Sequence, residues 1–478
     1  MIDTRKQRRS RERFAWIGIG AALVGLLFIV LIPTDVFAQA GAQNRRAENE
    51  RALEMFSQVF RFVQDNYVDE VEAEELIQGA LDGMFKSLGD PHSKYLSAEE
   101  MRGLSDTTSG QFGGVGMYIS KQPDTGNGTP AYVEVVSPIE GTPAYFAGVQ
   151  SGDLIVRIEG ASTAPLSIDE VLNRLRGRPG SEVNITLRRG RTHEFDVELV
   201  RDVIQVPTVR RDMIDDDIGF MRIIQFTPYT NDRVRDAIEY FEESGYSSLI
   251  IDLRRNPGGL LAGVVETADL FLDGGLVVGT RGRSPRENEE FRASSGTAIS
   301  DNIPIVVLID GGSASAAEIL AGALKDRDRA FLIGQTTYGK GSVQQVRRIG
   351  DGGFRLTMSR YYTPSGTYID EAGISPDKVV REDELGDKEL EALATLRNER
   401  RIARFVEQNP SPSPADIDLF LQQLEQDGLN LRESVVRRMV RDEVNRMDGV
   451  TQVYDLEYDT VLQEAVRMLR GNQIIVTP

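Results

Sequence analysis

The 478-residue sequence contains no cysteine. That absence excludes disulfides, thiol nucleophiles and thiolate metal sites together. Histidine is almost as rare, since only His92 and His193 are present. Neither lies in a catalytic motif and there is no H-E-x-x-H pattern, which argues against a Ser-His-Asp triad and against a zinc hydrolase. The sequence therefore predicts an activity that uses no metal and no cofactor.

Positive charge is also scarce relative to negative charge, because 55 Lys and Arg face 74 Asp and Glu, giving a net charge of −19. A chain this acidic repels phosphate backbones, so we expect no nucleic-acid partner. Lysine is the rarer cation, with eight residues against 47 arginines. Where only charge matters the sequence uses arginine, so a lysine in a special context invites a chemical explanation.

The amino terminus has a basic stretch, RKQRRSRER, followed by residues 14–33 without any charge. That apolar run is long enough to span a bilayer, and its basic flank predicts that the rest of the chain is exported. The small-x-small pattern of Ala38-Gln39-Ala40 also fits signal cleavage. The sequence therefore predicts a periplasmic protein, and it leaves open whether residues 14–33 anchor it in the inner membrane or are removed.

Changes in sequence pattern divide the chain, and the expected fold class is α/β. After residues 1–40, the export segment, helical spacing of apolar residues predicts a helical region over 41–110. Short strands and glycine turns predict a compact inserted module over 111–204. Strands alternate with helices over 205–385, which predicts a core with a largely parallel sheet. Residues 386–478 again show helical patterns and form a C-terminal extension.

Two helix starts carry the capping-box pattern, in which a serine is followed three residues later by a glutamate. The sequence predicts one such start at Ser97 with Glu100 and another at Ser167 with Glu170.

The stretch GQTTYGKGS, residues 334–342, resembles a phosphate-binding P-loop at first sight. A P-loop requires Ser or Thr after Gly-Lys and a helix beyond it. Here Gly341 follows Lys340, and the next residues, SVQQVRRI, GDGG and FRLTMSRYY, predict a β-hairpin. An exported chain also has little access to ATP. The pattern therefore argues against an NTPase and leaves Lys340 to be explained.

A serine lies in a suitable place for Lys340 to activate. The strand IPIVVLID runs into Gly311-Gly312, and a helix of small residues follows, so a serine at its start is exposed beside the helix dipole. We expect Ser313 to cap that helix, which leaves Ser315 without a structural role. Lysine can lose its proton when desolvated, and with no suitable histidine Lys340 is the remaining base for Ser315. Gln344, four residues further on, is placed to orient the amine.

These stretches, GSASAAEILAGALKD and YGKGSVQ, resemble the C-terminal processing peptidases, or tail-specific proteases. The resemblance extends to GDPHSKYLSAEEM near the amino terminus, to DLRRNPGG at 252–259 and to AGVQSGDLIVRIEG in the inserted module. It covers about residues 50–380 and recurs in DTVLQEAVRML. It implies a serine endopeptidase with a PDZ domain at 111–204.

The resemblance also assigns residues to roles. The nucleophile and base would be Ser315 and Lys340, with Gln344 beside them. The oxyanion hole would combine a backbone N–H of Gly258 or Gly259 with that of Ala316. FGGVGM would be the PDZ loop that binds the carboxylate of a substrate tail, and its N–H groups belong to Gly113, Gly114, Val115 and Gly116.

Partners follow from the same picture, because the expected substrates are proteins with accessible C-terminal tails. A PDZ scaffold without catalysis is the rival interpretation, and the intact Ser315 and Lys340 argue against it. Arg176, at the end of the PDZ helix, either senses tail docking or only meets the helix dipole.

In the C-terminal extension two apolar stripes are expected to cap the protease core or to bind a second copy or an adaptor. The first stripe consists of Ile417, Phe420, Leu421 and Leu424, and the second of Val435, Val436, Met439, Val440 and Val444.

Overall fold

The computed structural model describes residues 34–98, 100–101, 111–121, 132–139, 141–150, 152–190, 192–381, 385–450 and 452–471. The chain divides into two compact units, residues 1–89 and residues 90–478. Within the described ranges no helix is both long and apolar enough to cross a membrane. The predicted export segment at 14–33 lies outside the described residues.

The first unit is helical, as predicted for the start of the 41–110 region. Helix α2 spans Thr34–Asn66 and helix α3 spans Ala73–Lys86. The apolar residues that recur along α2 are exposed, with Leu53 at 68% and Phe62 at 69% exposure. Beyond this unit, the capping box predicted at Ser97 is present, because Ser97 N–H donates to Glu100 and Glu100 N–H donates back to the Ser97 hydroxyl.

The α/β core predicted at 205–385 is built on a six-stranded sheet in the order β10-β11-β12-β15-β16-β19. Within this sheet β11, β12, β15, β16 and β19 run parallel to one another, and β10 is antiparallel to its neighbour β11. This confirms the α/β class and the largely parallel sheet. The strands span Val209–Ile214 (β10), Ile218–Ile223 (β11), Ser248–Asp252 (β12), Ile305–Ile309 (β15), Phe331–Gly334 (β16) and Lys378–Val379 (β19).

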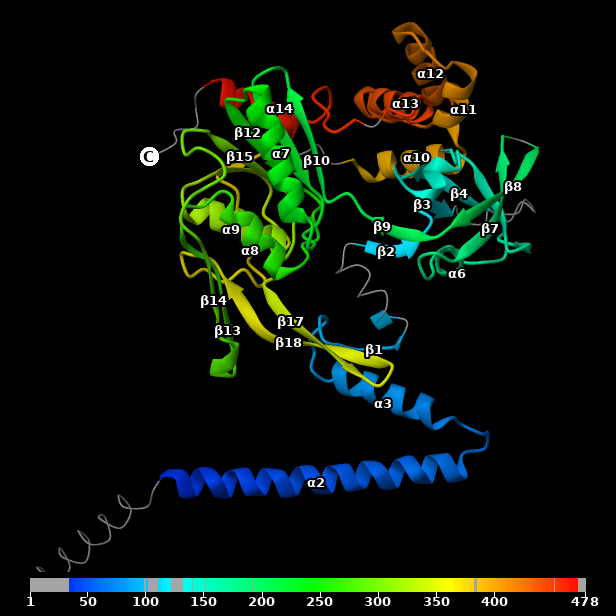
Figure 1. Cartoon of the computed structure of the whole chain (residues 1–478). Coiled ribbons are helices and arrows are strands. Elements are labelled where there is room, and N and C mark those ends of the chain that lie inside the picture. Colours follow the sequence, from blue (N-terminus) through cyan, green and yellow to red (C-terminus); the bar gives the residue numbers. More distant parts are fainter. Residues whose placement is uncertain are drawn as a thin grey trace, which may run out of the picture. The chain divides into compact units, whose positions relative to one another are not determined.

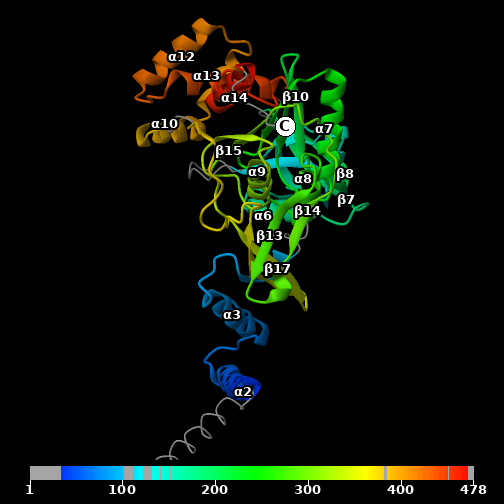
Figure 2. The ribbon, with the colours of Figure 1, turned by 90° about the vertical axis from the view of Figure 1, so that its left-hand side faces the viewer.

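Helices cover both faces of this sheet (Figure 2). In β12, Leu249 and Ile251 point into the cluster formed with α7, α8 and α9, whereas Ile250 between them points toward α14. Strands buried on both faces have continuous apolar sequences, which is why SLIID and IVVLI lack alternation. The helices span Thr230–Ser244 (α7), Leu261–Asp269 (α8), Ala316–Asp326 (α9) and Thr460–Arg470 (α14).

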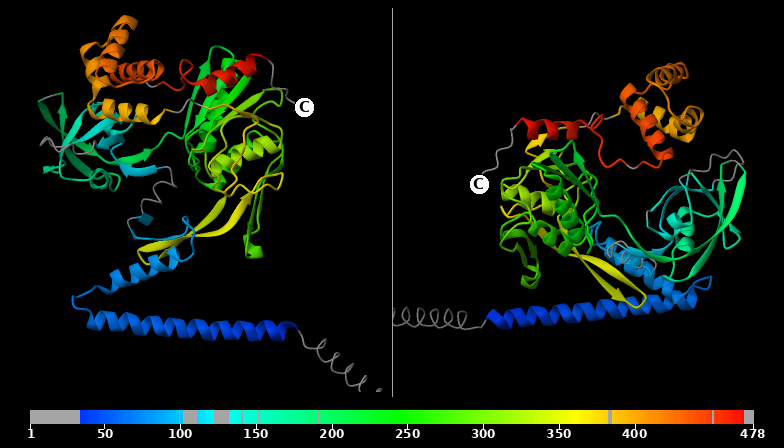
Figure 3. Two further views of the ribbon diagram at one scale, coloured as in Figure 1. Left: turned by 180° about the vertical axis from the view of Figure 1, so that it is seen from behind. Right: turned by 45° about the horizontal axis from the view of Figure 1, so that its top comes forward.

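A second sheet contains the hairpin predicted after Lys340. Strands β17, Ser342–Ile349, and β18, Gly352–Tyr362, pair in antiparallel fashion (yellow in Figure 3). Strand β17 follows Lys340 where a P-loop requires a helix, so the predicted hairpin is confirmed. β18 also pairs with β1, Lys94–Leu96, and with β13, Gly275–Gly282, which pairs with β14, Glu290–Ala293.

The inserted module has its own sheet in the order β3-β4-β5-β7-β8 and its own apolar core. Helix α6, Ile168–Leu175, begins with the predicted capping box of Ser167 and Glu170. Strand β2, Gln111–Gly114, begins the module and strand β9, Asp202–Gln205, ends it, and these two strands pair with each other. The remaining elements span Met117–Lys121 (β3), Val133–Pro138 (β4), Pro143–Phe146 (α5), Leu154–Ile158 (β5), Ala161–Ser162 (β6), Glu182–Arg189 (β7) and His193–Val200 (β8).

Except for Val435, the residues of the two apolar stripes of the C-terminal extension pack against each other and not against the core sheet. Together with α10 and α11, helices α12 and α13 bury them in a separate cluster that includes Phe420, Leu424, Val436 and Val440 (orange in Figure 1). The expectation that these stripes cap the core is therefore wrong, because α14 is the helix that caps the sheet. The four helices span Asp387–Asn398, Arg401–Gln408, Pro414–Gln426 and Glu433–Met447.

Candidate active site

Ser315 lies at a sharp turn between strand β15 and helix α9. Its backbone has φ 56° and ψ −114°, a left-handed conformation that non-glycine residues rarely adopt. Such strain is typical of functional positions, where the surrounding structure holds the residue in place. The side chain is partly exposed at the first turn of α9, as the sequence predicts for a nucleophile.

Ser313 has a different role from the predicted one. Helix α9 begins at Ala316, so Ser315 occupies the N-cap position and the prediction that Ser313 caps the helix is wrong. Ser313 is fully buried, and its hydroxyl donates to the Leu253 carbonyl at 2.8 Å while accepting from Asp310 N–H at 3.0 Å. A serine after Gly-Gly can close a turn in this way as readily as it can cap a helix.

One buried carboxylate, that of Glu318 in the first turn of α9, connects the serine to the lysine loop. Its Oε2 accepts hydrogen bonds from the backbone N–H of Ser315 at 2.7 Å and of Lys340 at 2.9 Å. Its Oε1 accepts from Gly339 N–H and from the Thr337 hydroxyl, both at 2.6 Å. Burial raises the pKa of Glu318, and the four donors, which lower it, offset only part of that rise. Because the three backbone donors cannot accept a proton, the arrangement uses the ionised carboxylate.

Close backbone packing explains the two glycines around Lys340. A Cβ at Gly341 would lie 2.1 Å from the Asp370 nitrogen, and Gly339 adopts φ 88° beside the backbone of Glu371. A side chain at either position would collide with this neighbouring backbone and displace the lysine loop. The loop is also tied to the nucleophile turn directly, because Tyr338 N–H donates to the Ser313 carbonyl at 3.0 Å.

The half-buried Lys340 has the electrostatic setting expected of a base. Burial lowers the pKa of its amine, the positive charge of Arg355 lowers it further, and Glu318 raises it. The net effect is a lowered pKa, so more of the amine is neutral near pH 7 than in an exposed lysine. Arg355 is half-buried on β18, and its Nε donates to the His92 carbonyl at 2.8 Å.

The structure does not join the predicted dyad by a hydrogen bond. In the part of the chain that the structure describes, no hydrogen bond connects the Ser315 hydroxyl with the Lys340 amine. Gln344 lies on β17, and its amide donates to the backbone carbonyl and the hydroxyl of Ser342 at 2.9 and 2.8 Å. Its predicted contact with the Lys340 amine therefore stays a prediction.

The DLRRNPGG loop lies against Ser315, as the sequence predicts. A Cβ at Gly258 would come 2.7 Å from the Ser315 Cβ and 2.9 Å from the Ala316 nitrogen. Gly258 N–H donates to the side chain of Asn256 at 2.8 Å. Gly259 lies opposite Phe226 in a parallel β-bridge, whose hydrogen bonds are made by the Gly258 carbonyl and the Leu260 N–H. The N–H of Gly259 takes no part in the bridge and is left for another acceptor.

Comparison with known proteins identifies this arrangement. The model for peptidase family S41 matches residues 217–380, and a PDZ domain model matches 134–189. A model described as the activating protease CtpB N-terminal domain matches residues 31–100. A carboxy-terminal-processing protease of Bartonella bacilliformis is 40% identical over 73% of this chain and 79% of its own. The chain belongs to peptidase family S41.

A second relative agrees with this membership, which makes the chain a serine peptidase with a PDZ domain. The carboxy-terminal processing protease CtpA of Bacillus subtilis is 32% identical over 73% of this chain and 76% of its own. A solved photosystem II D1 C-terminal processing protease is 28% identical, covers 69% of this chain and 92% of its own, and has a TM-score of 0.41.

In the PDZ domain of this S41 peptidase, the predicted tail-binding loop packs tightly. A Cβ at Gly113 would lie 2.1 Å from the Gly177 carbonyl oxygen, and Gly177 N–H donates to the Gly113 carbonyl. Gly114 to Gly116 are buried, and the Val115 carbonyl accepts from Ala144 N–H in α5. The loop is therefore held from both sides through its backbone.

Arg176 adjoins this loop. It is the C-cap of α6 and has an extended backbone, and its guanidinium stacks over the Phe112 ring at 4.9 Å from the centroid. A Cβ at Gly114 would lie 3.9 Å from the Arg176 Cα. The structure thus brings Arg176 to the predicted tail-binding loop, while its sensing role stays a prediction.

Sequence reasoning missed three residues that shape the site. Glu318 follows Ser315 by three residues, which is the same capping-box spacing that correctly predicted Ser97 with Glu100 and Ser167 with Glu170. That signal was available. Asn256 also had a local signal, because Asn-Pro-Gly is a turn pattern in which the asparagine side chain accepts from the N–H two residues on, here that of Gly258. Arg355 had no comparable signal, because its partner, the His92 carbonyl, is set by tertiary structure.

Proposed function

We propose that this S41 peptidase is an exported endopeptidase that binds the C-terminal tails of protein substrates through its PDZ domain. It hydrolyses peptide bonds with a dyad of Ser315 and Lys340, and it processes or degrades proteins of the cell envelope. The names of the two curated relatives, both carboxy-terminal processing proteases, support this substrate class.

The observation that carries the proposal is the shared carboxylate of Glu318. It accepts from the backbone of both Ser315 and Lys340, so the nucleophile turn and the lysine loop are held on one group. The neutral Lys340 amine takes the proton from the Ser315 hydroxyl as its oxygen attacks the peptide carbonyl. The resulting ammonium returns the proton to the leaving amine. In the second half, Lys340 takes a proton from water, which attacks the acyl-enzyme, and Ser315 is regenerated.

Backbone N–H groups complete the site by stabilising the negative oxygen of the tetrahedral intermediate. Ala316 supplies one group from the first turn of α9, where the helix dipole also favours negative charge. Because Gly258 N–H donates to Asn256, we assign the second group to Gly259.

Tail recognition is assigned to the PDZ loop of Gly113, Gly114, Val115 and Gly116. A substrate tail adds to a sheet edge and its carboxylate meets loop N–H groups, as in other PDZ complexes. Arg176 is proposed to report docking to the protease core, since it stacks on Phe112 beside the loop.

The test of the dyad uses an unfolded protein as substrate and three variants. Ser315→Ala and Lys340→Ala are expected to lose at least about 1,000-fold in kcat, since both groups act as one unit. Lys340→Arg should be equally inactive, because arginine cannot give up its proton.

Lys325→Arg is the matched control for the arginine substitution, since Lys325 pairs with Asp377 at 2.8 Å and donates to the Ser375 carbonyl at 2.7 Å, and both contacts need a charged donor and no proton transfer. It should keep wild-type turnover. Wild-type rates in a folded Ser315→Ala or Lys340→Arg variant would refute the dyad.

Export and membrane attachment depend on residues 1–40 and are proposed from sequence alone. Cell fractionation followed by amino-terminal sequencing of the mature chain tests them. A soluble periplasmic chain that begins at Gly41 would refute the anchor, and a cytoplasmic chain would refute export.

The C-terminal extension is proposed to mediate self-association or adaptor binding. The truncation must spare α14, because α14 covers the core sheet. Deleting residues 387–450 and measuring the mass in solution is the appropriate test. An unchanged oligomer would exclude the self-association version, and an adaptor version would then require a partner captured by the full chain and lost by the deletion.

A further inference from the structure

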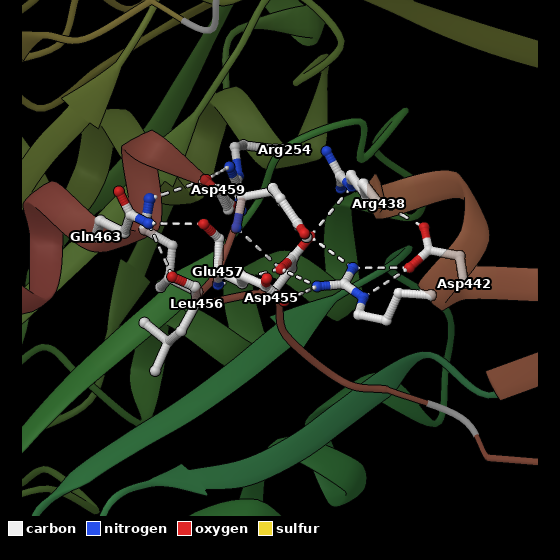
Figure 4. Close-up of polar contacts among 11 residues, drawn as sticks. Arg254, Arg438, Asp442, Asp455, Leu456, Glu457, Asp459 and Gln463 are labelled. Atoms are coloured by element: carbon white, nitrogen blue, oxygen red, sulfur yellow. Dashed lines mark hydrogen bonds and ion pairs between the residues drawn. The ribbon is translucent and has the colours of Figure 1, made fainter. Parts of the chain in front are cut away.

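Arg254 precedes the predicted oxyanion loop and lies between two carboxylates from distant parts of the chain. Its Nε and Nη2 donate to Asp252 at 2.9 and 2.8 Å, at the carboxyl end of β12. Its Nη1 and Nη2 donate to Asp459 at 2.9 and 2.6 Å, 205 residues away in the sequence (Figure 4). Burial acts to lower the pKa of Arg254, and the two carboxylates outweigh it and raise the pKa. All three side chains are nearly buried, with 11% exposure for Arg254, 2% for Asp252 and 10% for Asp459.

The loop that follows Arg254 needs to be held in place. Arg255 adopts φ 57°, and Gly258 and Gly259 adopt φ 100° and 145°. The two glycines adopt such angles without strain, but Arg255 does not, so neighbouring contacts must hold its part of the turn. Asn256 fixes the far end of the loop through Gly258 and the Ile223 carbonyl. The paired carboxylates of Asp252 and Asp459 fix the near end through Arg254.

Asp459 is itself held firmly. It is the N-cap of α14, where it accepts from Leu462 N–H at 2.9 Å, and α14 packs on the core sheet. Its backbone N–H also donates to the Asp455 carbonyl at 3.2 Å. Asp455 is one end of a short turn that connects Asp459 to helix α13.

The turn is anchored to α13 by a second ionic contact. The Asp455 carboxylate accepts hydrogen bonds from both terminal nitrogens of Arg441 at 2.8 and 2.9 Å, and it lies 3.1 Å from the Arg438 Nε. These contacts, together with those of Asp442 and Glu457, are drawn in Figure 4. A continuous set of ionic and backbone contacts therefore leads from the C-terminal extension to the oxyanion loop.

We propose that Asp459 is a positioning residue for catalysis, which holds the oxyanion loop through Arg254 and is itself supported by the Asp455–Arg441 ion pair of the C-terminal extension. The proposal rests on the proposed function of Ser315 and of the Gly259 N–H. Asp459 never touches the substrate. It fixes the position of the turn at 254–259, so its loss weakens binding of the tetrahedral intermediate more than binding of the substrate.

Asp459→Asn is the informative variant. Asparagine caps helices about as well as aspartate, so the bond to Leu462 N–H is kept while the charge facing Arg254 is lost. With a short peptide that carries no recognition tail, kcat should fall at least about tenfold, a smaller loss than deletion of an oxyanion donor, and KM should change less than about twofold. The inhibition constant of a peptide boronate, which forms a tetrahedral anion on the serine, should rise by the same factor as kcat/KM falls.

Glu464→Gln is the matched control on the same helix. Glu464 pairs with Arg467 and Lys378, which lower its pKa to about 2, and it has no contact with the oxyanion loop. Its loss removes one charge and two ion pairs from α14 but should leave kcat and boronate affinity within twofold of wild type. Thermal unfolding of both variants shows whether the helix stays docked.

Arg254→Lys supplies a second route if Asp459→Asn folds poorly. Lysine keeps the charge but cannot form both forked pairs, so the same selective loss of kcat is expected. In the double variant the two losses should not add, because both act through one contact. Asp459→Glu, which retains the charge, should recover part of the activity.

Several outcomes would overturn the proposal. These are a kcat for Asp459→Asn within twofold of Glu464→Gln, a loss confined to KM, or additive losses in the double variant. An inactive Ser315→Ala alongside a fully active Asp459→Asn would refute only the positioning role. A fully active Ser315→Ala would refute the proposed function itself.

Discussion

In the protease core the groups proposed to react are side chains, whereas in the PDZ domain the groups proposed to bind are backbone N–H groups. Both regions hold their functional loop by close backbone packing. A Cβ at Gly258 would collide with Ser315, and a Cβ at Gly113 would collide with the Gly177 carbonyl. The core adds a buried charge to this packing, since Glu318 holds the turn of Ser315 and the loop of Lys340 together.

This difference predicts which amino-acid substitutions each region can tolerate. The chemistry of the core depends on particular side chains at fixed positions, so conservative changes there are expected to be severe. The PDZ loop depends on the absence of side chains and on the adjoining end of α6. Changes in the PDZ domain should therefore affect substrates that carry a tail, while changes in the core should affect every substrate.

The largest effect is expected from Glu318→Gln. One amide oxygen cannot accept the four hydrogen bonds that the carboxylate accepts, and the amide NH₂ would face backbone donors in a buried site. We expect kcat to fall about 100-fold for tailed and short substrates alike, through displacement of the nucleophile turn and the lysine loop. Peptide hydrolysis and thermal unfolding measure the two consequences.

Glu170→Gln is the matched control in the PDZ domain. Glu170 has the same capping-box spacing, with its carboxylate accepting from Ser167 N–H at 2.7 Å, but it is exposed. Because this carboxylate is exposed, we expect its loss to change stability little and to leave turnover of a short peptide unchanged. Similar kinetic losses in both variants would contradict a special role for Glu318.

A pair of glycine substitutions tests the comparison most directly. Gly258→Ala should lower kcat for all substrates, because its Cβ would push against Ser315 and Ala316. Gly113→Ala should raise KM for a tailed protein by about tenfold and leave hydrolysis of a short peptide within twofold, because it moves the loop away from α6. Steady-state kinetics with both substrates decides. A loss of short-peptide hydrolysis in Gly113→Ala would show that the PDZ loop also holds the core.

Arg176→Ala should have a smaller effect. If Arg176 reports docking, turnover of tailed substrates should fall several-fold while tail affinity, measured with a labelled tail peptide, stays within twofold. Arg178→Ala, an exposed arginine two residues further on, is the control. Equal loss of turnover and tail affinity in Arg176→Ala would mean that Arg176 only holds the Phe112 loop.

The smallest effect is expected from Arg355→Gln and concerns pH. The charge of Arg355 lowers the pKa of Lys340, so its removal should raise that pKa. Activity requires the neutral amine, and the acid limb of kcat/KM should therefore move to higher pH, with little change on the alkaline plateau. Arg348→Gln, an exposed arginine on the same hairpin, should leave the profile in place. A shift in the opposite direction, or none, would contradict this electrostatic role.

Much of the protein could be predicted from the sequence because the signals are local. Continuous apolar strands between amphipathic helices indicate a parallel sheet, which is why the α/β core was predicted correctly. The hairpin after Lys340 followed from two alternating segments around GDGG. The lack of suitable histidines and the rarity of lysine indicated Ser315 and Lys340. In the structure the backbone N–H groups of these two residues donate to the same carboxylate, that of Glu318.

Only the tertiary structure decided how these parts are held. Nothing local relates Asp459 to Arg254, because 205 residues separate them and the contact exists only once α14 has packed on the sheet. The same is true of the apolar stripes of α12 and α13, whose periodicity predicts helices with a buried face but does not say what buries it. Periodicity and capping are read over a few residues, whereas burial, shared hydrogen bonds and charge pairing depend on which surfaces meet.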